Sequence, residues 1–160
     1  MADAREVGRR FIEAFNAHDQ QRMRQLNADN TLFEAPGEVK IEGGEAASEY
    51  AMGWVRAFPD ARITVHNEVM AGDWGVQEFT FTGTHQETLI SPAGEIPPTH
   101  KTLSGRAVQI FRDRGRDHRR HAALFRSGSG DDTARTDGRA GDRLTRLLQP
   151  PSALGALVQA

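Results

Sequence analysis

Apolar and polar residues alternate along three long segments in the middle of the chain, residues 62–70, 73–86 and 101–112. These segments are rich in Val, Ile, Thr, Phe and Trp, and turn residues separate them, first at residues 71–73 and then in a proline-bearing loop over residues 91–100. This composition and this period of two predict three strands of a half-buried antiparallel sheet. The segments that precede them are expected to cover one face of the sheet.

Three helices are predicted before the sheet, because apolar residues recur there at spacings of three and four. The first helix begins at Asp3, a residue type that suits the N-cap position, and ends near Asn16. The second helix is shorter and begins after Asp19, which can cap it in the same way. The two helices are expected to form a hairpin, with these apolar residues facing inward: Val7, Phe11, Phe15, Met23 and Leu26.

A third helix is predicted over about residues 44–58, after a short strand over residues 31–35. Small residues form one stripe of this helix, and Tyr50, Trp54 and Phe58 form a second stripe at a spacing of four. Such a helix can lie close to a curved sheet and still project aromatic rings. The rings are expected either to pack in the core or to line a cavity, and their helical spacing favours the core.

One face of each predicted strand is more apolar than the other and contains one or two polar residues. The two faces of the first strand carry Ile63, Val65, Asn67 and Val69 on one side and Thr64, His66, Glu68 and Met70 on the other. The corresponding faces of the later strands carry Gln77, Phe79, Phe81 and His85, and then Leu103, Gly105, Ala107, Gln109 and Phe111. A polar residue in such a row is either a satisfied core residue or the specificity element of a ligand pocket.

Composition narrows the class of protein further. The 160 residues carry a formal net charge of -2, which suits one soluble domain with its own core. The absence of cysteine excludes disulfides, thiolate metal sites and cysteine nucleophiles. Apolar runs stay well short of the roughly 20 residues of a membrane span, and charges interrupt the N-terminus, so neither a membrane segment nor a secretion signal is expected. We expect a cytoplasmic protein.

Several strings, in a fixed order, resemble a known family: FIEAFNAHD, FEAPG, EYAMGWVRAFPDARI, AGDW, GTH, EIPPT and SGRAVQIFR. Over about residues 5–112 the chain resembles the SnoaL-like polyketide cyclases, which belong to the nuclear-transport-factor-two-like superfamily. The resemblance implies a cone-shaped α+β fold, in which three helices pack over a curved antiparallel sheet and enclose a deep apolar cavity, commonly in a homodimer. Members include enzymes that close a polyketide ring by an intramolecular aldol condensation without a cofactor.

The resemblance also implies where catalytic groups would stand. In the cyclases the SG strand carries a glutamine and, two residues later, a histidine, and the following strand carries an acid-base aspartate. The corresponding positions here hold Ala107 and Gln109. Glutamine can donate or accept a hydrogen bond but cannot take up a proton at neutral pH. This difference argues against the same proton transfers and leaves ligand binding intact.

Two other titratable residues are the catalytic candidates, His85 in the GTH string and Glu34 after the short strand. Burial would make Glu34 a base by raising its pKa, and a histidine titrates near neutral pH; an exposed position would remove either role. The residues expected to line a ligand pocket are Phe33, Tyr50, Trp54, Phe58, Trp74, Gln77, Phe79, Leu103, Ala107, Gln109 and Phe111. The spacing of histidines and carboxylates indicates no metal site, and no cofactor is expected.

The sequence changes character at Arg112. From there onward it holds ten of the eighteen arginines but no lysine, glutamate or tryptophan, and it lacks the period of a strand or a helix. We expect residues 1–112 to form the domain, residues 113–125 to be an atypical segment with a makeshift last strand over residues 118–125, and residues 126–160 to be a disordered Arg/Asp/Gly-rich tail. Six aspartates among those arginines weaken the local field, so no nucleic-acid binding is expected.

Two explanations of this change stay open: a basic tail, or a GC-rich gene read out of frame after Arg114. If one guanine is removed at the codon of Gly115, compatible codons give R-D-R-D-G-T-I, a strand-turn-strand signal, and then a strand and an amphipathic helix. In that case the printed chain has lost the final strand of its sheet. It would then expose a long strand edge and be poorly stable.

The sequence as a whole favours a protein with a small-molecule cavity. It would be a cofactor-free cyclase or isomerase that acts on a hydrophobic, polyketide-like carbonyl compound, or a binder without catalysis. The alternative is a dimerising protein-interaction module of the same fold. The expected partners are a hydrophobic small molecule and a second copy of the chain, and neither a nucleic acid nor a membrane is expected.

Overall fold

The computed structural model describes residues 4–35, 39–91, 94–112 and 123–124. The helices within these ranges are α1 (Ala4–Asn16), α2 (Gln20–Leu26) and α3 (Gly44–Ala57). The strands are β1 (Leu32–Ala35), β2 (Val39–Glu42), β3 (Arg62–Ala71), β4 (Trp74–Thr84), β5 (Leu89–Ser91), β6 (Gly94–Ile96), β7 (Thr102–Arg112) and β8 (Ala123–Leu124). The three helices and the three long strands lie where the sequence predicts them.

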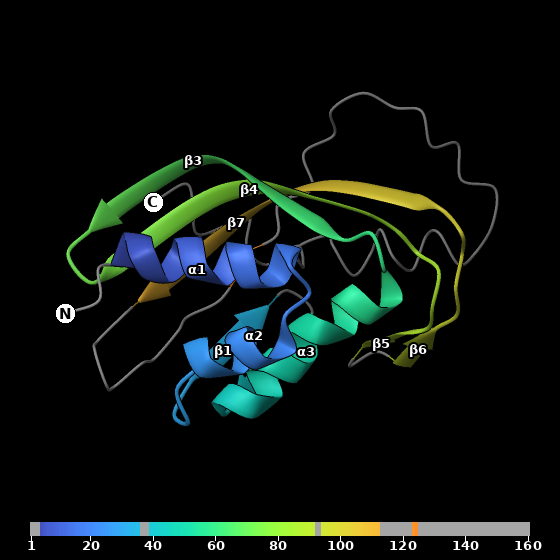
Figure 1. The fold of residues 1–160 in the computed structure, drawn as a ribbon, viewed down its shortest axis with the longest axis horizontal. Coiled ribbons are helices and arrows are strands. Elements are labelled where there is room, and N and C mark those ends of the chain that lie inside the picture. Colours follow the sequence, from blue (N-terminus) through green and yellow to red (C-terminus); the bar gives the residue numbers. More distant parts are fainter. Residues whose placement is uncertain (1–3, 36–38, 92–93, 113–122, 125–160) are drawn as a thin grey trace, which may run out of the picture.

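The main sheet is antiparallel and has the order β3-β4-β7-β8. Its long strands arch over α1, and α2, α3 and the β1–β2 hairpin lie on the same side of the arch (Figure 1). The predicted α+β architecture, a curved sheet with three helices packed over it, is confirmed. The hollow side of the sheet is called the inner face below.

Side-chain hydrogen bonds cap the start of α2 and fix the end of α1 to the sheet. Asp19 caps α2 by accepting from the backbone N–H of Arg22 at 2.9 Å, as its position in the sequence predicts. At the end of α1, the Asn16 side chain donates to Ile63 O at 2.9 Å and accepts from Ile63 N at 2.7 Å. Asn16 thus pairs with β3 as a neighbouring strand would, and it sets the distance between α1 and the sheet.

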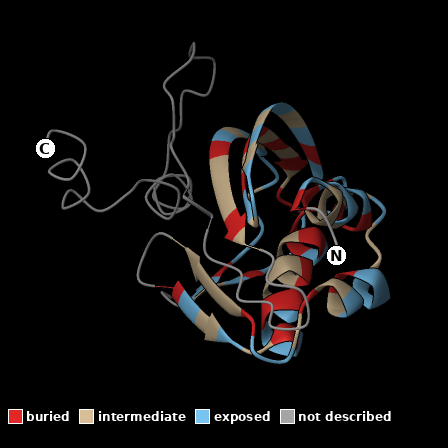
Figure 2. Cartoon of the chain, turned by 90° about the vertical axis from the view of Figure 1, so that its left-hand side faces the viewer, coloured by how far each residue is buried: buried red, intermediate tan, exposed pale blue. Residues whose placement is uncertain are grey.

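Aromatic rings form the centre of the core between α3 and the inner face. Phe58 is wholly buried, and its ring lies edge-on to Phe81 with centroids 5.4 Å apart. Phe15 of α1 reaches the same Phe81 ring at 6.4 Å. Buried and half-buried residues alternate along β4 (Figure 2), and the buried side of this strand supplies part of the core.

A β-bulge interrupts β3 at His66, which the sequence analysis did not predict. Val65 pairs with Phe79, and Asn67 pairs with Glu78, the neighbour of Phe79. His66 is therefore an extra residue on β3 that has no residue opposite it in the backbone register with β4. Such a residue rotates the remainder of its strand relative to the sheet.

Because of this rotation, one predicted face of β3 differs from the observed one. Ile63 and Val65 point inward as predicted, but Val69 is 65% exposed while Glu68 and Met70 are half-buried. The prediction that Asn67 and Val69 share the inner face is wrong, because a single extra residue exchanges the two sides of a strand.

The β5–β6 hairpin replaces part of the loop predicted over residues 91–100. Its strands are short, and Leu89 and Ile96 pair across them with exposed fractions of only 2% and 4%. Burial of these two side chains against α3 and the core stabilises an arm that local sequence alone does not indicate. The β2 strand was likewise not predicted.

The last described strand, β8, pairs through Leu124 with Val108 and through Ala123 with Gln109. It falls within the predicted makeshift strand over residues 118–125. The predictions for Gly115 and for residues 126–160 lie outside the described residues. None of the helices in the described ranges is long and apolar enough to cross a membrane.

Candidate functional site

Three polar side chains form a row across the inner face of the sheet. The backbone register places Glu68 of β3 opposite Gln77 of β4, and Gln77 opposite Gln109 of β7. Gln77 Nε2 donates to Glu68 Oε2 at 3.3 Å, and Gln109 Nε2 donates to Gln77 Oε1 at 2.6 Å. Arg5 of α1 contacts Glu68 Oε1, the other oxygen of the carboxylate. The Glu68–Gln77–Gln109 row therefore joins three strands and α1 through hydrogen bonds.

Helix α1 covers this row closely because its residue at the contact is Gly8. A Cβ atom at Gly8 would lie 2.6 Å from Phe111 Cζ and 2.9 Å from Gln77 Nε2. The Phe111 ring in turn lies over Gly75, where a Cβ atom would meet it at 2.3 Å. Gln77 is consequently only 1% exposed, whereas Gln109 is half-buried. Of the two amides, Gln109 is therefore the more exposed.

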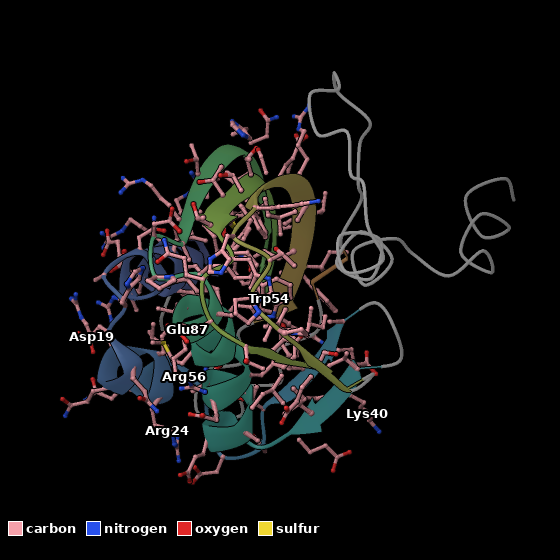
Figure 3. All side chains as sticks on the ribbon, turned by 90° about the vertical axis from the view of Figure 1, so that its right-hand side faces the viewer. Asp19, Arg24, Lys40, Trp54, Arg56 and Glu87 are labelled. Atoms are coloured by element: carbon pink, nitrogen blue, oxygen red, sulfur yellow. The ribbon has the colours of Figure 1, made fainter. Side chains whose placement is uncertain are left out.

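Aromatic residues of α3 continue the inner surface away from the row. Trp54 stacks on Phe58 with centroids 5.7 Å apart and meets Phe81 edge-on at 5.7 Å. Figure 3 shows Trp54 in the interior, between α3 and the strands, while the labelled Arg24 and Lys40 lie at the periphery. Phe58 belongs to the core, as the helical spacing favours. Trp54 is half-buried and packs against that core.

Tyr50 of α3 packs against Phe33 of β1, with ring centroids 5.1 Å apart. Burial raises the pKa of the Tyr50 hydroxyl, and a hydrogen bond with the Trp54 side chain offsets part of that effect. Because an indole nitrogen only donates, the Tyr50 oxygen accepts this bond and keeps its own proton available. Tyr50 can therefore act as a neutral hydrogen-bond donor.

His85 lies at the end of β4, where the strand meets the β5–β6 arm. Its imidazole is wholly buried and stacks on Phe58 with centroids 5.0 Å apart. The backbone N–H of Thr99 donates to Nδ1 at 3.2 Å, so in the neutral ring the proton is on Nε2. Burial lowers the pKa of His85 and favours this neutral form. Within the described residues Nε2 has no hydrogen-bond partner, which makes it a buried donor.

The predicted catalytic and polar residues do not meet at one point. Gln77 and His85 share the inner face as predicted, but eight residues separate them, up to about 26 Å along an extended strand. Glu34 is half-buried on β1. Because side chains alternate along a strand, Glu34 points away from the side on which its neighbour Phe33 meets Tyr50.

The remaining predicted pocket residues divide between the two faces of the sheet. Phe79 and Ala107 are register partners, and both are buried on the inner face. Leu103 packs against the core cluster further along β7. Trp74 instead lies on the outer face of β4, where the Arg112 guanidinium sits 4.9 Å from its ring centroid. The structure thus does not bring Trp74 together with the other predicted residues.

Sequence reasoning missed Glu68, although it completes the polar row. Strict alternation puts Glu68 on the outer side with Thr64 and His66, and the bulge at His66 reverses that assignment. Glycine or proline within a strand often marks a bulge in the sequence, but β3 contains neither residue type. The sequence of β3 therefore gave no signal of the bulge.

The described residues contain no group of three His, Asp or Glu side chains placed to hold a metal ion. Two surface depressions lie between the helices. One is lined mainly by charged residues of α1 and α2, and the other by polar and charged residues of α2 and α3. Neither depression includes a residue of the polar row.

Comparison with solved structures identifies the fold. A candidate SnoaL-like polyketide cyclase from Jannaschia sp. CCS1 matches with a TM-score of 0.65 and 16% identity, over 92% of this chain and 93% of that chain. IdmH, a candidate polyketide cyclase from Streptomyces antibioticus, matches with a TM-score of 0.60 and 23% identity, over 77% and 90%. AclR, a candidate hydroxylase from Streptomyces galilaeus, gives 0.58 and 18%, over 76% and 85%. At these identities the matches show the nuclear-transport-factor-two-like cone fold alone.

Comparison by sequence gives the family. A search of curated protein sequences found no match. The profile of the SnoaL-like polyketide cyclase family, in contrast, matches residues 5–117, which include every described helix and the strands from β1 to β7. The chain therefore belongs to the SnoaL-like polyketide cyclase family.

Proposed function

We propose that this protein binds a hydrophobic, polyketide-like carbonyl compound against the inner face of its sheet and promotes its cyclisation or isomerisation without a cofactor. The observation that carries the proposal is the Glu68–Gln77–Gln109 row. Buried polar groups in an apolar surface need partners, and a row that ends on a half-buried amide offers polar atoms to a ligand. Membership of the polyketide cyclase family supports this substrate class.

The proposed chemistry is an aldol-type step with no net oxidation. A base removes a proton from the carbon next to a carbonyl, the enolate carbon bonds to a second carbonyl carbon, and the new alkoxide takes up a proton. The Tyr50 hydroxyl is the donor that could stabilise an enolate oxygen, because the His85 imidazole is wholly buried in the core. Glu34 is the carboxylate that the sequence predicts as a base, but it points away from the side on which Phe33 meets Tyr50, and Gln109 cannot accept a proton at neutral pH, which weakens the catalytic candidate relative to ligand binding.

A ligand-binding protein without catalysis is the second candidate. It is favoured by Ala107 and Gln109, two side chains that do not titrate, on the strand where the cyclases carry a histidine. A dimerising module of the same fold belongs to this class as well. Sedimentation equilibrium of the full chain would test the proposed homodimer, and fractionation of cells that produce the chain would test the proposed cytoplasmic location.

Two measurements on the full chain separate the candidates. Thermal shift with a panel of polycyclic and steroid-like ketones should raise Tm if the inner face binds such compounds. Proton–deuterium exchange at the carbon next to the ketone, followed by NMR in D₂O, should exceed the buffer rate only if the protein is a catalyst. Gln109→Leu should abolish the thermal shift, and Gln86→Leu, at an exposed position, should retain it. A panel that never raises Tm would overturn the proposal.

A further inference from the structure

The hydrogen bonds of the polar row all point the same way: Gln109 donates to Gln77, and Gln77 donates to Glu68. An ionised carboxylate has no proton to donate, so it can only accept hydrogen bonds. The Gln77 group that faces Glu68 must therefore be the NH₂ group, in agreement with the 3.3 Å contact from Gln77 Nε2. This choice turns Gln77 Oε1 toward Gln109, and Gln109 must present its own NH₂ group to that oxygen. One carboxylate thus determines the orientation of two amides.

Packing prevents the middle member from turning over. Gln77 is 1% exposed, and the backbone of α1 at Gly8 closes over it. If the Gln77 amide turned over, its oxygen would face the Glu68 carboxylate and its NH₂ group would face that of Gln109. The hydrogen bond to Glu68 would be lost inside the protein, and the bond to Gln109 would form again only if that amide turned over as well. The hydrogen bond from Gln77 to the Glu68 carboxylate therefore holds the row in one direction.

Arg5 and the bulge hold the carboxylate in place. Arg5 contacts Glu68 Oε1, which leaves Oε2 for Gln77. The extra residue at His66 turns Glu68 inward, into register with Gln77. Neither feature acts on a ligand directly. Both act through the position of the Glu68 carboxylate.

We propose that Glu68 is a positioning residue that fixes Gln109 with its carbonyl oxygen available, so that the inner face selects ligands with a hydroxyl or enol donor at this point. This inference rests on the proposed small-molecule function, whose site it describes more closely. Gln109 uses one N–H on Gln77, and within the described part of the chain no residue donates to its Oε1. A half-buried carbonyl oxygen can accept a hydrogen bond from a ligand O–H, whereas an ether at the same place would leave it unpaired.

The direction of the row can be tested without any ligand. In ¹H–¹⁵N spectra of the full chain, the side-chain NH₂ groups of Gln77 and Gln109 should each give a single, sharp pair of signals. Glu68→Gln should shift the signals of both amides and give Gln109 a second or broadened NH₂ signal, because a glutamine at position 68 can face Gln77 with either group. Glu13→Gln, which removes an exposed carboxylate from α1, should leave both sets of signals unchanged. Signals that respond equally to the two variants would overturn the positioning role.

Ligand selection is tested with 2-naphthol and 2-methoxynaphthalene, which differ by one methyl group on the oxygen, so that only the naphthol can donate a hydrogen bond. The full chain should bind the naphthol about tenfold more tightly, the factor expected for one added buried hydrogen bond. Glu68→Gln should reduce this preference to about twofold, and Glu13→Gln should keep it. Equal binding of both probes by the unaltered chain would overturn the selection. If neither probe nor any ketone of the panel binds, the proposed function fails, while the NH₂ signals still decide the direction of the row.

Discussion

At the scale of single residues, His85 shows how a fold can remove the charge from a titratable group. The Thr99 amide occupies Nδ1, the Phe58 ring covers one face, and no water-exposed surface remains. A proton on Nδ1 would break the bond to Thr99 and put a charge into the core. His85 is therefore better suited to donate from Nε2 than to act as a base, which limits the catalytic role that the sequence suggests for it.

The lowered pKa of His85 predicts that the protein loses stability as the pH falls. The folded-state pKa lies below that of an unfolded histidine, about 6.5, so the unfolded chain binds a proton first. The free energy of unfolding contributed by His85 is complete above that unfolded pKa and decreases as the pH falls through it toward the folded pKa. Urea denaturation at pH 7.5 and at pH 5 measures the difference.

His85→Asn is the matched variant for this prediction, since its side-chain oxygen can still accept the Thr99 N–H but does not titrate. We expect a smaller loss of stability between the two pH values for this variant than for the unaltered chain. All other titratable groups are common to both proteins. An equal pH dependence would show that His85 is not neutral in the folded protein.

Single residues also show what the sequence could and could not predict about the site. Alternation places Gln77, Phe79 and Phe81 correctly on the inner face, because β4 is regular from end to end. It misplaces Glu68, because the position of a bulge depends on packing across strands and not on the residues of β3 alone. The placement on the inner face was therefore predictable for two of the three residues of the row, Gln77 and Gln109.

At the scale of elements, the contact between α1 and the sheet depends on a glycine. We predict that Gly8→Ala destabilises the protein, since the added Cβ would overlap Phe111 and Gln77, two side chains that are themselves packed. Overpacking costs roughly 1–3 kcal/mol, and the gain in helix propensity of about 1 kcal/mol offsets only part of it. Urea denaturation should show a net loss of up to about 2 kcal/mol.

Gly53→Ala is the control for that prediction. Gly53 also lies within a helix, α3, but the nearest atom to an added Cβ is the end of the Arg56 side chain at 3.9 Å. The propensity gain of up to about 1 kcal/mol should then appear without a clash. If both alanine variants are stabilised, α1 does not approach the sheet as closely as described.

The elements themselves were predictable where a strong period was present. The helices and the long strands have long, regular patterns, and the structure has them close to the predicted bounds. The β5–β6 arm was not predicted, because its three-residue strands are too short to show a period and gain their stability from contact with α3. In this proline-bearing loop, tertiary contacts rather than local sequence thus determine whether strands form.

At the scale of the whole molecule, the pairing along the β7 edge of the sheet is short within the described residues. β7 has 11 residues, and in the described part of the chain β8 pairs with Val108 and Gln109 only. Unpaired strand edges promote association and lower stability. The order of helices and strands came from periodicity, but the cone shape of the fold came from the family resemblance, since a hydrophobic pattern does not specify curvature.

A frame shift at the codon of Gly115 gives a prediction at this scale. If the gene carries one extra guanine there, the protein made after its removal should have a complete last strand and a Tm several degrees higher, since each kcal/mol raises Tm by about 2–8 °C. Differential scanning calorimetry of the two chains measures this. Resequencing codons 112–118 from independent DNA tests the cause. A confirmed printed frame together with an equal Tm would contradict the hypothesis.

The extra residue at His66 has a consequence for comparing this protein with its relatives. Successive side chains of a strand point to opposite sides of the sheet. Each one-residue insertion therefore moves every later side chain, including a carboxylate, to the other side. A relative without the bulge would need its acidic residue one position earlier to reach the same place in the sheet. Residues aligned with Glu68 by sequence alone would then be non-equivalent in space, and functional residues in β3 should be matched by their cross-strand partners on β4.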